Sequence, residues 1–257
     1  MVRRTLLAFA LFFALPDQAQ VPPARRTLSV AAAANLKTAA EELKRGFEAA
    51  QPGVTVTLTF GASGTFFSQL QHGAPFDLFL SADREYPARL VAAGLGAAAD
   101  ERVYAVGKLV AWLPPGSTLD LEKRGLAALA DPAVKRIAIA NPAVAPFGRA
   151  SVAALKAAGV HETVQGKLVL GASVGQAAQF ATTGAADVAL LPCSLTSGKE
   201  LSAGRTFLLP EALYPRIEQS GIVLAAAAEP ALGRAFLAFT LGEPGRAILA
   251  RACYGLP

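Results

Sequence analysis

The sequence predicts an α/β fold in which mainly parallel sheets are covered by helices. Strand-like and helix-like segments alternate along the 257 residues, and such alternation is typical of parallel sheets with helices on both faces. The length allows one or two domains, each with a sizeable core. The chain contains neither an internal repeat nor a low-complexity linker. If the chain forms two halves, strands must therefore join them rather than a flexible tether.

The first residues have the pattern of a secretory signal. The chain opens with the positively charged segment MVRR, continues with an apolar stretch at 6–15, and becomes polar and alanine-bearing at 17–20. This order is typical of signal peptides, and the apolar stretch is too short to span a bilayer. We therefore expect residues 1–19 to be removed after Ala19, which leaves a soluble, exported protein.

The segments that follow alternate clearly between strand and helix. Residues 28–32 form a short apolar strand, and from Leu36 the apolar positions recur at helical spacing. Pro52 and Gly53 end that helix. Residues 54–60 then alternate apolar side chains with threonines, as in a strand with one buried face.

The rest of the chain continues this alternation. Further strands are expected at 76–81, 103–113, 136–140, 167–170, 187–191 and 221–226. Further helices are expected from Ser63 to about 71 and at 86–93, 121–129, 147–157, 174–182, 230–241 and 243–252.

The charge of the chain is mildly basic and evenly spread. The formal net charge is +5 at pH 7, and two of these charges, on Arg3 and Arg4, belong to the expected signal. Clusters of Lys and Arg with interleaved aromatic residues, which mark nucleic-acid surfaces, are absent from the sequence. We therefore expect no nucleic-acid partner.

Four strand-to-helix junctions share a composition of small and turn-forming residues. LSVAAAANL places Asn35 at a helix start, TFGASGT places Ser63 there, IANPAVAPFGRAS places Pro146 and Phe147, and LVLGASVGQ places Ser173 and Val174. In open α/β sheets, ligands bind at the carboxyl ends of the strands. Helix N-termini offer free N–H groups and partial positive charge, so converging junctions would suit a small, desolvated oxyanion without Lys or Arg. At each single junction, simple N-capping of the helix remains the alternative.

A secreted serine hydrolase is the rival from another class of function. The segment GASVG matches the G-x-S-x-G nucleophile elbow around Ser173. That fold needs a histidine after the serine, whereas His72 and His161 both precede it. We interpret His72 as a polar helix end and His161 as a polar loop residue.

The acidic residues do not indicate a metal site. Asp77 and Asp83 lie close together in PFDLFLSAD, and we interpret them as residues that orient loops or cap the following helix. No Cys/His cluster has metal-ligand spacing, and no G-x-x-x-x-G-K-[ST] phosphate loop occurs in the sequence.

The chain resembles the periplasmic molybdate-binding proteins of ABC transporters in five segments, which occur in this order: AAAANL, TFGASGTFFSQLQHGAPFDLFLSAD, IANPAVAPFGRAS, GASVGQAAQFATTGAADVALL and YPRIEQSGIVL. The resemblance covers nearly all of the mature chain. It implies two α/β lobes, the first at about 27–104 plus 217–257 and the second at about 105–216. It also implies that molybdate or tungstate is bound between the lobes by hydroxyls, amides and backbone N–H groups, and is delivered to a membrane permease and its ATPase.

The resemblance assigns four residues to the oxyanion. Asn35 and Ser63 match contacts in the first and second loops, whereas Phe147 and Val174 match positions that donate a backbone N–H. We expect both the side-chain amide and the backbone N–H of Asn35 to face the ligand. Pro192 stands where some members carry a contacting tyrosine, so one hydrogen bond is absent or replaced there, and Asn35 is the candidate to compensate.

These assignments predict a monomeric periplasmic protein that closes its lobes on molybdate. It needs no cofactor, performs no covalent chemistry, and holds molybdenum only as molybdate. A sulfate- or phosphate-binding protein of the same architecture is the main alternative. An oxidising compartment permits a disulfide between Cys193 and Cys253, but such a bridge would join the two lobes and restrain their closure. We therefore expect both thiols to be free or only partly accessible.

Overall fold

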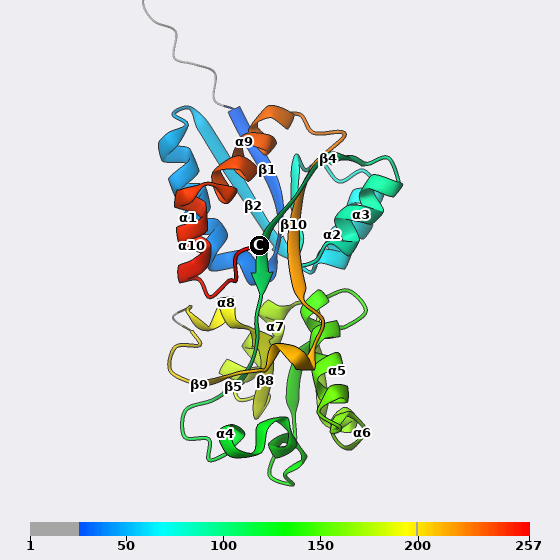
Figure 1. Cartoon of the computed structure of the whole chain (residues 1–257), viewed down its shortest axis with the longest axis vertical. Helices are drawn as coiled ribbons and strands as arrows, with labels where there is room; N and C mark the ends of the chain where they lie inside the picture. The colour runs from blue at the N-terminus through cyan, green and yellow to red at the C-terminus, as the bar shows by residue number, and fades with distance from the viewer. Residues whose placement is uncertain (1–25, 199) are drawn as a thin grey trace, which may run out of the picture.

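The computed structural model describes residues 26–198 and 200–257, so the expected signal peptide lies outside the described residues. Figure 1 shows two α/β lobes, one above the other, each built around its own sheet. Both sheets have five strands. No helix in the described ranges is both long and apolar enough to cross a membrane.

The first sheet has the strand order β2-β1-β3-β10-β4. Its strands are β1 (Arg26–Ala33), β2 (Val54–Gly61), β3 (Leu78–Leu80), β4 (Gly96–Gly107) and β10 (Ile217–Leu224). β1 pairs in parallel with β2 and β3, whereas β10 runs antiparallel to both β3 and β4. β10 alone therefore runs against the other four strands, and the predicted mainly parallel sheet is confirmed.

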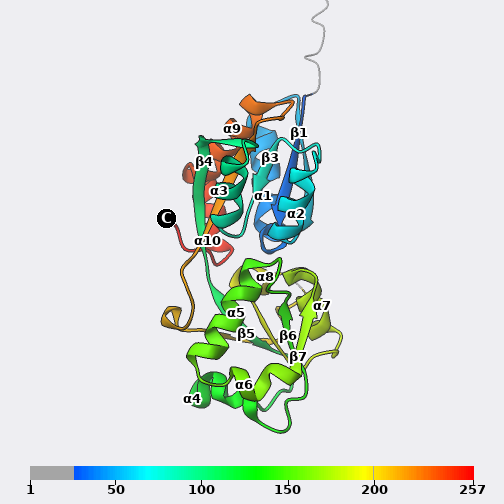
Figure 2. The same cartoon turned by 90° about the vertical axis from the view of Figure 1, so that its right-hand side faces the viewer.

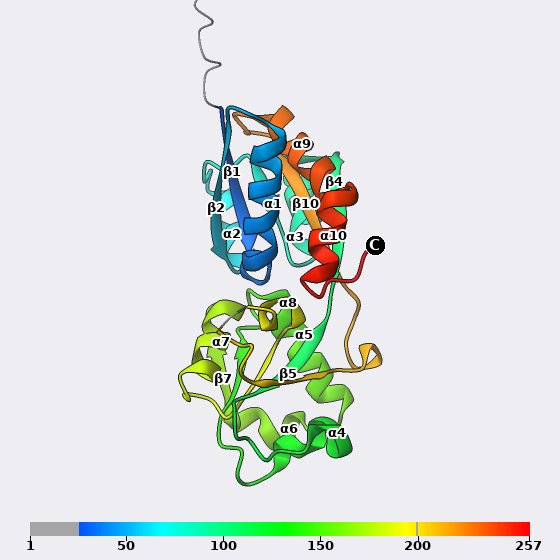
Figure 3. The same cartoon turned by 90° about the vertical axis from the view of Figure 1, so that its left-hand side faces the viewer.

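Helices cover both faces of this sheet. Those on one face are α1 (Lys37–Ala50), α9 (Pro230–Leu241) and α10 (Glu243–Arg251), and those on the other are α2 (Ser63–Gln71) and α3 (Glu85–Ala92). Figure 3 shows the first group in front of the sheet, and Figure 2 shows α2 and α3 on the opposite side. Strand β1 serves both faces, because Val30 packs into the core under α1 while its neighbour Ala31 packs under α2 and α3.

The second sheet repeats this plan with the order β7-β6-β8-β5-β9. Its strands are β5 (Leu109–Leu113), β6 (Ile137–Ala140), β7 (Leu168–Gly171), β8 (Val188–Pro192) and β9 (Arg205–Leu208). Its α-helices are α4 (Leu121–Arg124), α5 (Pro146–Ala157), α6 (His161–Val164), α7 (Val174–Thr182) and α8 (Cys193–Thr196). Here β5 is the one strand that runs against the others.

The two sheets are joined by extended chain. β4 passes directly into β5 through Lys108, and the chain returns from β9 to β10 through the short 3-10 helix η4 (Glu211–Leu213). We call the part that carries the first sheet lobe one (26–107 and 217–257) and the part that carries the second sheet lobe two (108–216). The first sheet thus extends to Gly107, beyond residue 104, where we expected lobe one to end.

Several local predictions are wrong. The single strand expected at 103–113 is two strands in different sheets, because the buried apolar run continues across the crossover and hides the break at Lys108. β9 was not predicted, since it is a short and largely exposed edge strand without an apolar pattern. His161 begins the one-turn helix α6 rather than lying in a loop.

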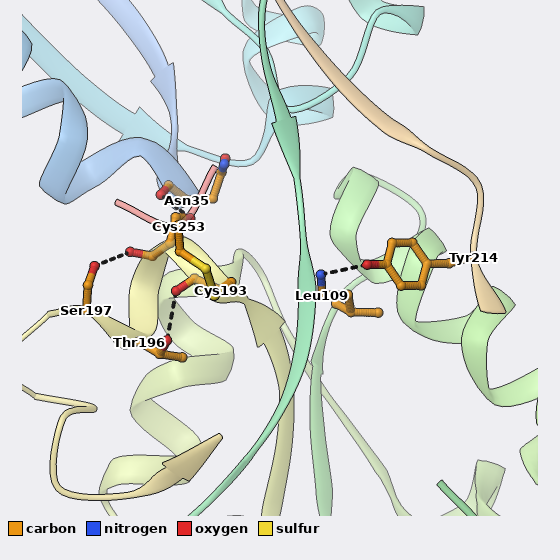
Figure 4. The surroundings of a disulfide bond; sticks show 8 residues. Asn35, Leu109, Cys193, Thr196, Ser197, Tyr214 and Cys253 are labelled. Atoms are coloured by element: carbon orange, nitrogen blue, oxygen red, sulfur yellow. Dashed lines mark hydrogen bonds between the residues drawn. A yellow bond between two sulfur atoms is a disulfide. The ribbon is translucent and has the colours of Figure 1, made fainter. Parts of the chain in front are cut away.

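The expectation of free thiols is also wrong. Cys193 and Cys253 form a disulfide, with their Cα atoms 5.7 Å apart (Figure 4). Both cysteines lie beside the β4–β5 crossover, because the Cys193 N–H donates to Lys108 O (2.8 Å) and Gly255 pairs with Val106. A bridge at the crossover joins the lobes where the chain already joins them, so it restrains closure far less than one across the open side.

Candidate functional site

The four junctions singled out from the sequence meet at one cavity between the lobes. Its walls include Asn35 from the first turn after β1, Ser63 at the start of α2, Phe147 at the start of α5 and Val174 at the start of α7. The space between the atoms, part of it open to solvent, is about 210 Å³. The predicted convergence is therefore confirmed, and the cavity suits a small ligand.

The cavity offers partial positive charge without a charged side chain. Its lining residues are all neutral, most of them alanine, glycine or proline. The first N–H groups of a helix have no partner within the helix, and they carry the positive end of its dipole. Four helix starts aimed at one small space thus make a site for an anion whose charge is balanced by N–H dipoles.

Ser63 lines the cavity and does not cap its own helix. The N-cap of α2 is Ala62, and Ser63 is the first helical residue, so the capping alternative is wrong for this serine. The side chain is fully buried, and its Oγ accepts a hydrogen bond from the Ala82 N–H (3.0 Å). Since that bond uses the oxygen as acceptor, the hydroxyl hydrogen of Ser63 remains to be donated at the cavity wall.

Asn35 is held differently from the sequence prediction. Its side-chain Nδ2 donates to Gln219 Oε1 (2.9 Å) and to Tyr254 Oη (2.9 Å), so both amide hydrogens are used inside the protein. The expectation that this amide group faces the ligand is therefore wrong for this structure. Asn35 is not a helix cap either, because the N-cap of its 3-10 helix η1 (Ala34–Leu36) is Ala33. Its Oδ1 has no partner among the described residues, but an amide oxygen cannot donate, so a hydrogen bond from Asn35 to an anion in the cavity has to come from its backbone N–H.

The other two junctions also offer backbone groups. Pro146 occupies the first turn of α5, as expected, and the ring of Phe147 is buried against Gly107 at the crossover. Val174 is the first residue of α7, whose N-cap is Ser173. Pro192, where a contacting tyrosine was expected in some relatives, ends β8 and does not line the cavity.

The lobes touch each other around the cavity. The Gly64 N–H of lobe one donates to Val144 O of lobe two (2.8 Å), next to Ser63. Arg149 of α5 forms ion pairs with Asp83 (2.5 Å) and Glu85 (3.2 Å) of lobe one. The sequence did not single out Arg149, although it follows directly after Phe147 and Gly148, because nothing in one sequence shows which lobe a charged side chain will reach.

Asp83 has a second role besides that bridge. Its Oδ1 accepts from the Tyr86 N–H (3.2 Å) at the start of α3, whose N-cap is Arg84, so Asp83 orients the turn before this helix rather than occupying its cap position. Burial raises the pKa of its carboxyl group, and the bonds from Tyr86 and Ser81 together with the charge of Arg149 oppose this shift. Asp77 is confirmed as a loop-orienting residue, since its carboxylate accepts from the N–H groups of Ser29 and Glu229.

The geometry does not assemble a hydrolase site around Ser173. Its Oγ accepts from the Gln176 N–H (3.4 Å) of its own helix. His72 contacts Ser68 O at the end of α2, and His161 contacts Glu162, so each histidine bonds locally. The described part of the chain contains no group of three or more His, Cys, Asp or Glu side chains that could hold a metal ion.

Comparison with known proteins gives consistent matches along the chain. A family model described as bacterial extracellular solute-binding protein matches residues 28–255. The chain is 38% identical over 236 residues to the molybdate-binding protein of Rhodobacter capsulatus, covering 92% of this chain and 91% of that protein. It is 35% identical to the molybdate-binding protein of Azotobacter vinelandii, over 89% of this chain and 90% of that one. The solved structure of the periplasmic molybdate-binding protein of A. vinelandii matches with a TM-score of 0.82 at 32% identity, over 90% of this chain and 99% of that chain.

Proposed function

The chain belongs to the bacterial extracellular solute-binding protein family, and from that premise we propose that it captures molybdate in the periplasm and delivers it to the membrane permease of an ABC transporter. Two relatives of at least 35% identity, each aligned over about nine-tenths of its length, are molybdate-binding proteins. These relatives are binding proteins rather than enzymes, and the local bonding of Ser173, His72 and His161 agrees with that role.

The observation that carries the proposal is the small neutral cavity at four helix starts. A tetrahedral dianion needs donors from several directions, and the cavity is walled by the starts of η1, α2, α5 and α7. In a site closed from water, each N–H···O contact is stronger than in solvent. A neutral wall also avoids a fixed cation, which would equally attract other anions, so selectivity depends on how the donors fit the ligand.

In this proposal each of the four residues has a defined part. Ser63 donates its hydroxyl hydrogen, and Asn35, Phe147 and Val174 donate backbone N–H groups. Lobes one and two close on the ligand by a hinge motion at the crossovers, and the protein works as a monomer. Tungstate, a tetrahedral dianion of nearly the same size, binds the same donors.

The proposal is tested by calorimetry of the mature chain with molybdate, tungstate, sulfate and phosphate. The smaller sulfate cannot reach all donors at once, and each donor left unpaired in a dry site costs about 1–3 kcal/mol. Two missed contacts give molybdate a preference on the order of a hundredfold or more over sulfate. Equal affinity for molybdate and sulfate, or binding of phosphate alone, would overturn the molybdate assignment.

A further inference from the structure

The backbone carbonyl of Asn35 accepts hydrogen bonds from two hydroxyl groups, and each hydroxyl belongs to the residue that follows one of the two disulfide cysteines. Tyr254 Oη donates to Asn35 O (2.8 Å), and Ser194 Oγ donates to the same oxygen (2.9 Å). Tyr254 follows directly after Cys253, and Ser194 follows directly after Cys193. Figure 4 shows Asn35 next to the bridge, at the point where the two lobes meet.

The backbone at Cys253 is shaped for this arrangement. α10 ends in the pattern of a Schellman motif, in which the Cys253 N–H donates to Ala250 O (3.2 Å) and the Tyr254 N–H donates to Leu249 O (3.1 Å). Cys253 has φ of 65°, in the left-handed region where such motifs usually carry glycine. A cysteine at this position joins the end of α10 to α8 and turns the Tyr254 side chain back towards η1.

The contacts around Asn35 form a buried network, in which Asn35 Oδ1 and Gln219 Nε2 have no partner among the described residues. Asn35, Ser194 and Tyr254 are each buried, and burial raises the pKa of the Tyr254 hydroxyl, so it stays protonated and able to donate. Asn35 Nδ2 also reaches Gln219 on β10, whose Oε1 accepts from Tyr104 Oη (3.2 Å). The peptide unit between Asn35 and Leu36 is therefore fixed from lobe one by Tyr254 and from lobe two by Ser194, and the Asn35 side chain is fixed by Gln219 on β10.

We propose that the Cys193–Cys253 disulfide positions the oxyanion site: it holds the hydroxyls of Tyr254 and Ser194 on the Asn35 carbonyl and so fixes the direction of the N–H groups of η1. This inference rests on the proposed function, because it treats η1 as one wall of the ligand site. Tyr254 and Ser194 act through Asn35 and do not themselves touch the ligand. Loss of the bridge therefore weakens binding through these two hydroxyls.

The test is a cycle of variants of the mature chain titrated with molybdate by calorimetry. The variants are the double substitution Cys193→Ser/Cys253→Ser, the single substitution Tyr254→Phe, and the triple combination. Each of the first two is expected to bind about tenfold more weakly. Because both act on one carbonyl, the triple variant is also expected to lose about tenfold rather than a hundredfold. Independent losses that multiply, or a bridge-free variant that binds like the parent, would overturn the inference.

A control and a second measurement separate this inference from the proposed function. Tyr214→Phe also removes a buried phenol contact, to the Leu109 N–H (3.1 Å), on the other side of the crossover in Figure 4. It is expected to leave molybdate affinity within about twofold. Amide hydrogen exchange over residues 33–37, measured without ligand, should be faster in the bridge-free and Tyr254→Phe variants than in Tyr214→Phe. Unchanged exchange in the bridge-free and Tyr254→Phe variants would contradict the positioning role, whether or not the parent binds molybdate. Failure of the parent to bind molybdate would contradict only the proposed function.

Discussion

The same tripeptide, Gly-Ala-Ser, occurs at equivalent strand-to-helix junctions of the two lobes, but its serine makes different contacts in each lobe. Gly61-Ala62-Ser63 begins at the last residue of β2, and Gly171-Ala172-Ser173 begins at the last residue of β7. Both strands lie at the edge of their sheet, β2 next to β1 and β7 next to β6. Ser63 is the first helical residue and is fully buried at the cavity, whereas Ser173 is the N-cap of α7 and bonds its own helix.

The difference arises from the strand two places away in the sheet, β3 in lobe one and β8 in lobe two, rather than from the tripeptide. In lobe one, the chain leaving β3 presents the Ala82 N–H, which donates to Ser63 Oγ. In lobe two, β8 ends at Pro192, which has no N–H, and the next N–H, of Cys193, donates to Lys108 O. With no such donor beside it, Ser173 accepts from the Gln176 N–H instead. Identical local sequence thus gives a buried serine at the cavity in one lobe and a helix cap in the other.

The largest effect is expected from a methyl group at Gly64, the residue after the lobe-one serine. A Cβ at this position would collide with Tyr86 Oη and would lie 2.8 Å from Val144 O of lobe two, so the lobes could not meet as they do. Since only the closed form holds all donors on the ligand, the apparent affinity falls with the closed fraction. Gly64→Ala is therefore expected to weaken molybdate binding by roughly a hundredfold or more.

The matched control for Gly64→Ala lies at the other junction. A Cβ at Gly175 would meet only Ser173 Oγ, at 3.5 Å, which is an ordinary contact. Gly175→Ala should keep affinity within about twofold and raise the free energy of unfolding by up to about 1 kcal/mol, since alanine favours helix. Calorimetry and thermal unfolding of both variants check this. Equal affinities for the two variants would show that the lobe-one junction is not the tighter one.

The second prediction exchanges the serines themselves for alanine. Ser63→Ala removes a hydroxyl donor to a dianion, which is worth about 1.5–3 kcal/mol and therefore about ten- to a hundredfold in affinity. Ser173→Ala removes only a cap and should cost about 0.5–1 kcal/mol of unfolding free energy, with affinity within about twofold. Molybdate titration of both variants well below their unfolding temperatures makes the comparison. Similar losses of affinity would mean that Ser173 also serves the ligand.

The sequence predicted the junctions better than the contacts of their side chains. Alternating segments and small-residue turns were enough to bring Asn35, Ser63, Phe147 and Val174 to one cavity, because parallel strands place all such turns at one edge. The partners of Asn35 could not be predicted in this way. Gln219 and Tyr254 lie 184 and 219 residues away from it along the chain, and only the pairing of β10 and the end of α10 brings them there.

The disulfide shows the same limit from another direction. From the sequence, a bridge between cysteines of different lobes was predicted to restrain closure. That prediction could not include how close each cysteine lies to the crossover. Pairing of Gly255 with Val106 and the bond from Cys193 to Lys108 place both beside it. Contacts across lobes depend on where the chain passes between sheets, and the apolar residues on both sides of Lys108 in 103–113 concealed that point.

The smallest effect is expected at the ion pair that fastens the lobe-one junction to lobe two. The side chains of Arg149 and Asp83 are 37% and 15% exposed, so their attraction is partly screened and should be worth about 1 kcal/mol. Arg149 also pairs with Glu85 and lies over the ring of Tyr86, so Asp83→Asn tests the pair more cleanly than removing the arginine. At neutral pH this variant should bind molybdate about three- to tenfold more weakly than the parent.

The Asp83–Arg149 pair should also make molybdate affinity depend on pH, and the pKa of Asp83 gives the direction of that dependence. Burial raises the pKa of Asp83, so the folded protein takes up this proton at a higher pH than the unfolded chain does. Acid therefore does not destabilise the fold through Asp83 itself. Instead, the free energy of unfolding contributed by this residue rises as pH falls through its folded-state pKa. The attraction to Arg149, by contrast, is present above that pKa and is lost below it.

The affinity of the parent should thus fall on acidification towards that of Asp83→Asn, and the ratio of the two dissociation constants should approach one. Protonation of the ligand affects both proteins alike and cancels in this ratio. A ratio that stays constant with pH would mean that the ion pair does not help to hold the lobes closed, and that Gly64 and Ser63 alone distinguish the junction of lobe one from that of lobe two.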